Sequence, residues 1–147
     1  MGEINDALGG GHILRGPNKQ YIVPPPTQAC YAAFERWLEN GARLRLEARR
    51  KTMTAAEYEE EKSALRRDIN SYVYSWGSQC AVDALRSAVG NTEFAAILIR
   101  QTDNSVTAAE IMKIAEHDPD HYAEVMKAVL GVEDDVPNEK AESQQAG

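Results

Sequence analysis

The chain has 147 residues, a formal net charge of −7 and 43% hydrophobic residues. This length suits one domain, and charged residues at 27% are ordinary for a soluble protein. The longest apolar run, residues 94–99, is far shorter than the roughly 18 apolar residues of a membrane span. The first residues also lack the basic and apolar regions of a secretory signal. We therefore expect one soluble domain and no membrane segment.

The negative charge is concentrated at the end of the sequence. Residues 132–147 hold five acidic side chains and one lysine, and so carry −4 of the net −7. Because this segment has few apolar side chains to bury, we expect a disordered acidic tail at 132–147, and a flexible N-terminus at 1–10. The remaining −3 gives no electrostatic case for nucleic-acid binding by the chain as a whole.

Residues 11–26 predict a β-hairpin followed by a proline-rich step. Residues 16–19, Gly-Pro-Asn-Lys, form a turn signal, and the apolar residues at 21–23 suit a strand. The prolines at 24–26 cannot donate to a strand ladder and end the second strand. Since an isolated two-stranded hairpin is marginal in stability, we expect it to pack on the helices, pair with another copy, or stay partly disordered.

Residues 27–131 predict a bundle of about six helices, which makes the fold mainly α. Thr27 is the expected N-cap of a helix over 28–51, in which Asn40–Gly41 is a candidate break. Thr54 and Glu57 form a capping box that opens a long helix. Its apolar seam predicts packing along a neighbouring helix. The seam steps by three and four residues and, apart from Lys62, consists of Tyr58, Leu65, Ile69, Tyr72 and Trp76.

Four shorter helices follow the long one. The first is expected to close at Gly90–Asn91, with Thr92 capping the next. That next helix is apolar on all sides around Phe94 and Leu98, which predicts a place at the centre of the core or beneath a partner. The last two helices open at a capping box, Thr107–Glu110, and at Asp118–Pro119, and Gly131 ends the final one.

Cys30 and Cys80 are the two cysteines, and both lie on the apolar faces of predicted helices. A disulfide framework normally needs more cysteines at regular spacing. We therefore expect two buried free thiols, without a disulfide bond or a redox role, as is typical of a reducing cytoplasm.

The sequence contains no pattern that favours catalysis. His117 and His121 are spaced like zinc ligands on a helix, but Asp118 starts the last helix, so His117 falls outside it and the shared face is lost. We interpret this segment as a helix cap. Because a phosphate loop, a nucleophile elbow and a paired-carboxylate signature are also missing, we expect a protein that is not an enzyme and that binds neither a metal nor a cofactor.

A basic run near the end of the first helix is a candidate for binding phosphate, RNA or an acidic protein surface. Four glutamates at positions 57 and 59–61 nearly balance it, so we favour a solvated helix end whose charges pair across helices. Nucleic acid remains the alternative ligand. The run consists of Arg43, Arg45, Arg49, Arg50 and Lys51.

The order of elements over residues 11–130 resembles the small tail assembly chaperones of long-tailed bacteriophages. The resemblance rests on the hairpin that runs into a Pro-Pro-Thr step, on Trp76–Gly77 before a helix, and on the apolar helix that ends at Arg100. A polar loop, the Thr107–Glu110 capping box and an acidic tail then follow. The chain departs from the family at residues 101–104, Gln-Thr-Asp-Asn, where a His-Pro pair is often found.

The resemblance implies a function in virus assembly. Such chaperones bind the long, aggregation-prone tape measure protein in the host cytoplasm before the tail tube polymerises, and they are absent from the finished virion. They often form homo-oligomers, and a longer form can arise by ribosomal frameshifting near the stop codon. The resemblance therefore predicts non-enzymatic protein binding, with the tape measure protein as partner.

Two apolar surfaces are the candidate sites for such a partner. They are the seam residues Tyr58, Leu65, Ile69 and Tyr72, and the residues Phe94 and Leu98 of the all-apolar helix. Full burial of both within the monomer is the alternative. Two other functions stay open: a small DNA-packaging or regulatory subunit that uses the basic run, and a structural head–tail joining component of the virion.

Overall fold

The computed structural model describes residues 11–131, and it is mainly helical with an N-terminal two-stranded hairpin, as predicted. The expectations for residues 1–10 and 132–147 lie outside the described residues. The elements are β1 (His12–Arg15), β2 (Gln20–Val23), α2 (Gln28–Arg49), a 3₁₀ turn η1 (Arg50–Thr52), α3 (Ala55–Asn70), α4 (Gln79–Arg86), α5 (Ala88–Ile99), α6 (Ala108–His117) and α7 (Pro119–Leu130).

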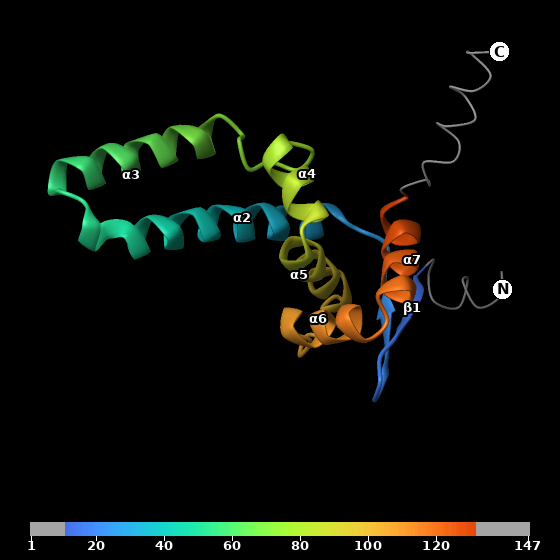
Figure 1. Cartoon of the computed structure of the whole chain (residues 1–147). Coiled ribbons are helices and arrows are strands. Elements are labelled where there is room, and N and C mark those ends of the chain that lie inside the picture. The colour runs from blue at the N-terminus through green and yellow to red at the C-terminus, as the bar shows by residue number, and fades with distance from the viewer. Residues whose placement is uncertain (1–10, 132–147) are drawn as a thin grey trace, which may run out of the picture.

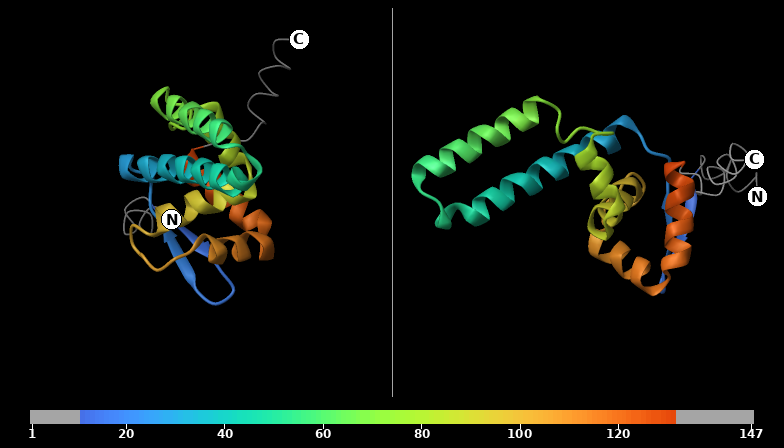
Figure 2. Two further views of the ribbon diagram at one scale, coloured as in Figure 1. Left: turned by 90° about the vertical axis from the view of Figure 1, so that its left-hand side faces the viewer. Right: turned by 45° about the horizontal axis from the view of Figure 1, so that its top comes forward.

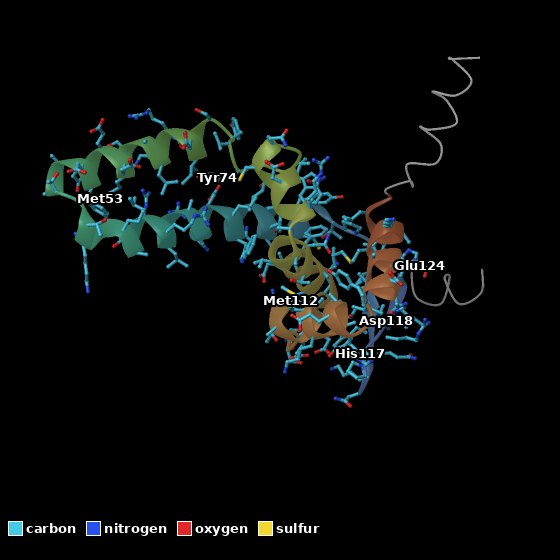
Figure 3. The ribbon with its side chains drawn as sticks, viewed as in Figure 1. Met53, Tyr74, Met112, His117, Asp118 and Glu124 are labelled. Carbon is cyan, nitrogen blue, oxygen red and sulfur yellow. The ribbon has the colours of Figure 1, made fainter. Side chains whose placement is uncertain are left out.

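The elements form a body and an arm (Figure 1). The body contains the hairpin, α4 to α7 and the first half of α2. The second half of α2 runs out of the body, and α3 returns beside it as a helical hairpin, which we call the arm (Figure 2). Met53 lies at the tip of the arm and Tyr74 near its base (Figure 3).

The β-hairpin packs on the helices of the body. β1 and β2 are antiparallel, with Leu14 opposite Tyr21, and both side chains are buried. The Tyr21 hydroxyl donates to Glu110 of α6 at 3.1 Å, and the backbone N–H of Arg15 donates to His121 of α7 at 3.0 Å. These contacts supply the support that an isolated hairpin lacks.

Helix α5 lies at the centre of the body. Its residues 94–99 are all buried, and its neighbours are α2, α4, α6 and β2. An aromatic cluster joins it to the base of the arm, because the Trp76 ring lies 4.3 Å from the Tyr31 ring and 4.9 Å from the Phe94 ring. The Trp76 backbone N–H also donates to the Glu35 carboxylate at 2.6 Å, which fixes the chain before α4.

Four of the five predicted N-caps are confirmed, and both cysteines are free thiols as predicted. Thr27, Thr54, Thr107 and Asp118 each accept a backbone N–H bond at the start of a helix. Each cap satisfies an amide that has no partner within its helix. Both cysteines are free, with Cys30 buried and Cys80 half-buried.

Three predicted boundaries are wrong. Helix α2 continues through Asn40–Gly41 without a break. The long helix ends at Asn70, so Tyr72 is not on a helical seam but in a turn, where its φ is 61°. Gly90 and Thr92 lie inside α5, whose N-cap is Ser87. The Thr92 hydroxyl donates to the Ala88 carbonyl at 2.7 Å, a bond within the helix that replaces the expected capping bond.

Within residues 11–131, every helix falls short of the length or the apolar content that crossing a bilayer requires.

The loop between α5 and α6 is tied to the turn of the hairpin by Asp103. Its carboxylate accepts from the Ser105 hydroxyl at 2.7 Å and pairs with the Lys19 ammonium at 3.0 Å. These bonds from Ser105 and Lys19 lower the pKa of Asp103 to about 2. Ionised Asp103 therefore stabilises the fold above its ordinary pKa of 3.8, and this contribution is lost as the pH falls through about 2.

Asp103→Asn is therefore expected to lower the Tm at pH 7, with the difference from the wild type shrinking between pH 4 and pH 2, a window set by that shifted pKa. Thermal unfolding monitored by circular dichroism at several pH values measures this. Glu124→Gln, which alters an exposed carboxylate of α7, is the matched control and should change the Tm little. An Asp103→Asn deficit that is constant down to pH 2 would contradict the assignment.

Candidate protein-binding groove

An open groove of about 770 Å³ lies between α4, the start of α5 and α7, and we call it the α4–α7 groove. Most of its lining is apolar. The apolar side chains include Trp76, Val82, Leu85, Ala88, Ala123 and Leu130. The groove therefore offers hydrophobic contact rather than a set of reactive groups.

The corner between α4 and α5 shapes one wall of the groove. Ser87 is both the C-cap of α4 and the N-cap of α5, because its hydroxyl donates to the Ala84 carbonyl at 2.7 Å and accepts from the Gly90 N–H at 3.0 Å. A Cβ on Gly90 would lie 2.0 Å from the Ala84 carbonyl oxygen. Glycine thus lets α5 start directly against the end of α4.

Two polar side chains of the groove, Tyr122 and Asn91, bond to each other and to the backbone of α4. The Tyr122 hydroxyl donates to the Asn91 side-chain oxygen at 2.6 Å, and the Asn91 amide donates to the Leu85 carbonyl at 2.9 Å. Burial raises the pKa of Tyr122, so the hydroxyl stays a neutral donor. This chain of bonds links α4, α5 and α7 and leaves the surrounding walls apolar.

Cationic side chains lie at the edge of the groove. Arg86 ends α4, and Lys127 lies on the last turns of α7. Val89, which follows the groove residue Ala88, is 61% exposed and adds apolar surface beside the groove. A ligand that suits this surface is apolar along one side and polar or acidic along its edges.

None of the six candidate partner-binding residues lines the α4–α7 groove. Phe94 and Leu98 are 0% exposed and belong to the core. Tyr58 is buried within the arm, and Leu65 and Ile69 are half-buried between α2 and α3. Tyr72 is 76% exposed on its turn. The groove could not be found from the sequence, because it is formed by α4 and α7 together. The apolar face of each helix was recognisable, but the sequence does not show that the two helices lie close together.

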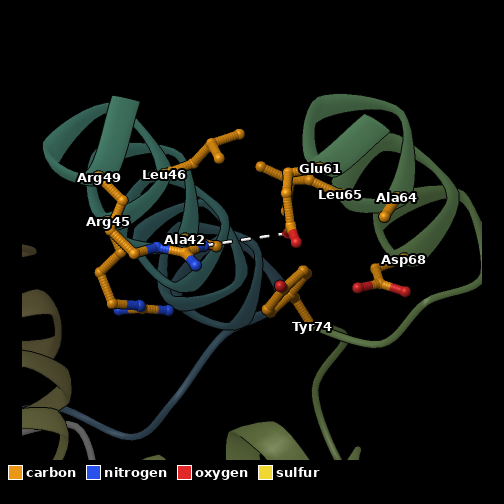
Figure 4. Close-up of a pocket in the computed structure, with 9 residues that line it drawn as sticks. All are labelled: Ala42, Arg45, Leu46, Arg49, Glu61, Ala64, Leu65, Asp68 and Tyr74. Atoms are coloured by element: carbon orange, nitrogen blue, oxygen red, sulfur yellow. Dashed lines mark ion pairs between the residues drawn. The ribbon is translucent and has the colours of Figure 1, made fainter. Parts of the chain in front are cut away.

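The basic run does not form one patch. Arg45 and Arg49 line a small pocket of about 180 Å³ on one side of the arm, facing Glu61 and Asp68 of α3 (Figure 4). Arg43 lies on the other side of the arm.

The last two residues of the basic run, Arg50 and Lys51, lie at the end of α2 and in η1. Arg50 lies over the Tyr58 ring at 4.4 Å and pairs with Glu47 at 3.5 Å, and Lys51 is exposed in η1. Arg49 pairs with Glu61 at 4.0 Å, which is the pairing across helices that the sequence predicts.

The histidine pair lies at the corner between α6 and α7. His117 is the last residue of α6, beside the cap residue Asp118 (Figure 3). His121 lies in α7, where its ring accepts the Arg15 backbone N–H, so it holds the hairpin. Within residues 11–131, no cluster of three or more His, Cys, Asp or Glu side chains is arranged to hold a metal ion.

No protein-family model matches this chain, and neither does any curated protein or solved structure. The groove's lining lacks a nucleophile paired with a base, and its Tyr122 and Asn91 side chains are engaged with each other and with the Leu85 carbonyl.

Proposed function

We propose that this protein is a non-enzymatic binding protein whose α4–α7 groove holds an amphipathic helix of another polypeptide. The observation that carries the proposal is the apolar lining of the groove between α4 and α7. Burial of apolar surface contributes roughly 25 cal/mol per Å² to such contacts. An amphipathic helix matches the groove because its apolar stripe would cover these side chains while its polar side stays in water.

We further propose that the bound polypeptide is a tape measure protein and that the chain acts as a phage tail assembly chaperone in the host cytoplasm. The order of elements supports this, since it resembles that of the family. A long helical client supplies many amphipathic segments, each of which is prone to aggregate before assembly. The net charge of −7 suits a chaperone that must keep such a client soluble.

The test is co-expression of the full chain with a tape measure protein from the same genome. We expect the two to co-purify and the soluble yield of the client to rise. Ala123→Glu places a carboxylate on the exposed groove residue of α7 and is expected to weaken binding about tenfold or more, because the apolar stripe of the ligand would have to desolvate the new charge. Ala128→Glu, on the exposed part of the same helix outside the groove, is the matched control and should bind like the wild type.

Three results would contradict the proposal. The first is failure of the client to co-purify or to gain solubility. The second is equal binding by the two glutamate variants, which would place the contact outside the groove. The third is detection of the chain in purified virions at a fixed copy number, which would indicate a head–tail joining component.

A further inference from the structure

A second groove, of about 440 Å³, lies on the arm on the other side of the α2–α3 contact from the pocket of Figure 4. The charged residues Arg45, Arg49, Glu61 and Asp68 line the pocket of Figure 4. Residues three, four or seven positions apart share one face of a helix, so these four side chains lie on the same side of the arm. We call the other side the cationic arm face. Its lining contains the cations Arg43, Lys62 and Arg66, the apolar residue Ile69, and Glu47, Tyr58 and Asn70, whereas Leu46 and Leu65 line both sides.

The two sides of the arm differ in how their charges are compensated. On the side of Figure 4, arginines of α2 face carboxylates of α3. On the cationic arm face the lining carboxylate is Glu47, which accepts from the Tyr58 hydroxyl and pairs with Arg50. The bond from Tyr58 lowers the pKa of Glu47, which keeps this carboxylate ionised and engaged. Among residues 11–131, Lys62 and Arg66 form no ion pair within 4.0 Å, and the charge of Lys62 acts on Glu47 only from a longer distance, where it helps to lower the pKa of that carboxylate.

The apolar residues of this face are incompletely covered. Leu46 and Tyr58 are the buried side chains of the arm, and they lie outside the core cluster of the body. Leu65 and Ile69 remain half-buried between the two helices. A third helix laid along α2 and α3 would cover both residues and complete a three-helix arrangement.

We propose that the cationic arm face binds an amphipathic helix of another protein whose apolar stripe is flanked by glutamate or aspartate. The cations select acidic flanks, because complementary charge favours the encounter and like charge opposes it. A second copy of the arm does not meet this requirement, since its own Lys62 and Arg66 would approach the same cations. This site is separate from the α4–α7 groove and does not depend on the function proposed for that groove.

The test uses two labelled helical peptides with the same leucine stripe, one flanked by glutamates and the other by lysines. Fluorescence anisotropy with the full chain is expected to show the glutamate peptide binding at least about tenfold more tightly, and more weakly as salt rises. The double variant Lys62→Gln/Arg66→Gln is expected to lose about tenfold in affinity for the glutamate peptide. Arg67→Gln, which changes an exposed cation of α3 outside the groove, is the matched control and should bind like the wild type.

The outcomes separate this proposal from its alternatives. Equal affinity for the two peptides, or no effect of the double variant, would overturn it. Loss of binding in Ala123→Glu would show instead that the peptide occupies the α4–α7 groove. Sedimentation that reveals a dimer abolished by Lys62→Gln/Arg66→Gln would assign the face to a second copy, and it would equally overturn the proposal.

Discussion

Replacing Gly90 with alanine is expected to destabilise the fold by about 3 kcal/mol or more. The new Cβ would lie 2.0 Å from the Ala84 carbonyl oxygen, a backbone atom that cannot rotate away. Relief would require α5 to move from α4 and would break the bonds that Ser87 makes to both helices. For a chain of this size the Tm should fall by roughly 6–12 °C. Thermal unfolding followed by circular dichroism gives the value.

Gly41→Ala is the matched control, because Gly41 also lies inside a helix. The nearest atom to its added Cβ is the end of the flexible Arg45 side chain, at 3.2 Å. Alanine should therefore stabilise α2 by up to about 1 kcal/mol through its higher helix propensity. A Gly90→Ala protein as stable as Gly41→Ala would disprove the close contact between α4 and α5.

Phe94→Ala is expected to destabilise the protein by about 3–5 kcal/mol, the usual cost of removing a buried phenylalanine. The Phe94 side chain is 0% exposed, and its ring lies 5.4 Å from Phe34 and 4.9 Å from Trp76. The cavity would open where α2, α5 and the base of the arm meet. Urea unfolding should show a lower midpoint with a similar slope.

Tyr72→Ala tests the contrasting position on the same predicted list of partner-binding residues. Its side chain is 76% exposed, so the free energy of unfolding should change by less than about 0.5 kcal/mol. A Phe94→Ala protein that keeps its stability but loses a partner would show that α5 serves binding and not the core.

Four of the six helix starts and the central place of residues 94–99 were predictable from sequence because their causes are local. A threonine or aspartate hydrogen-bonds to an amide a few residues on, as at Thr54, Thr107 and Asp118. Residues 94–99 are apolar on every side of the helix, and only a fully enclosed position suits them.

The errors arise where distant contacts decide the structure. Gly41 and Gly90 look alike in sequence, but one sits in an uninterrupted helix and the other against the Ala84 carbonyl. Tyr72 continues the spacing of the seam, yet the helix ends at Asn70 and the Trp76 backbone is fixed to Glu35 of α2. The sequence predicted the apolar residues Tyr58, Leu65 and Ile69 that line the arm groove, but it did not predict the α4–α7 groove, because the approach of α7 to α4 and α5 depends on the tertiary fold.

The buried residues of the arm lie outside the core cluster, so the arm and the body need not unfold together. Because Leu46 and Tyr58 are the buried side chains that hold the arm together, its opening requires far less free energy than global unfolding. We therefore expect the arm to behave as a separate foldon, with its amides exchanging through local opening while those of α5 stay protected. A ligand that rigidifies the arm would slow this exchange without changing the energetics of the body.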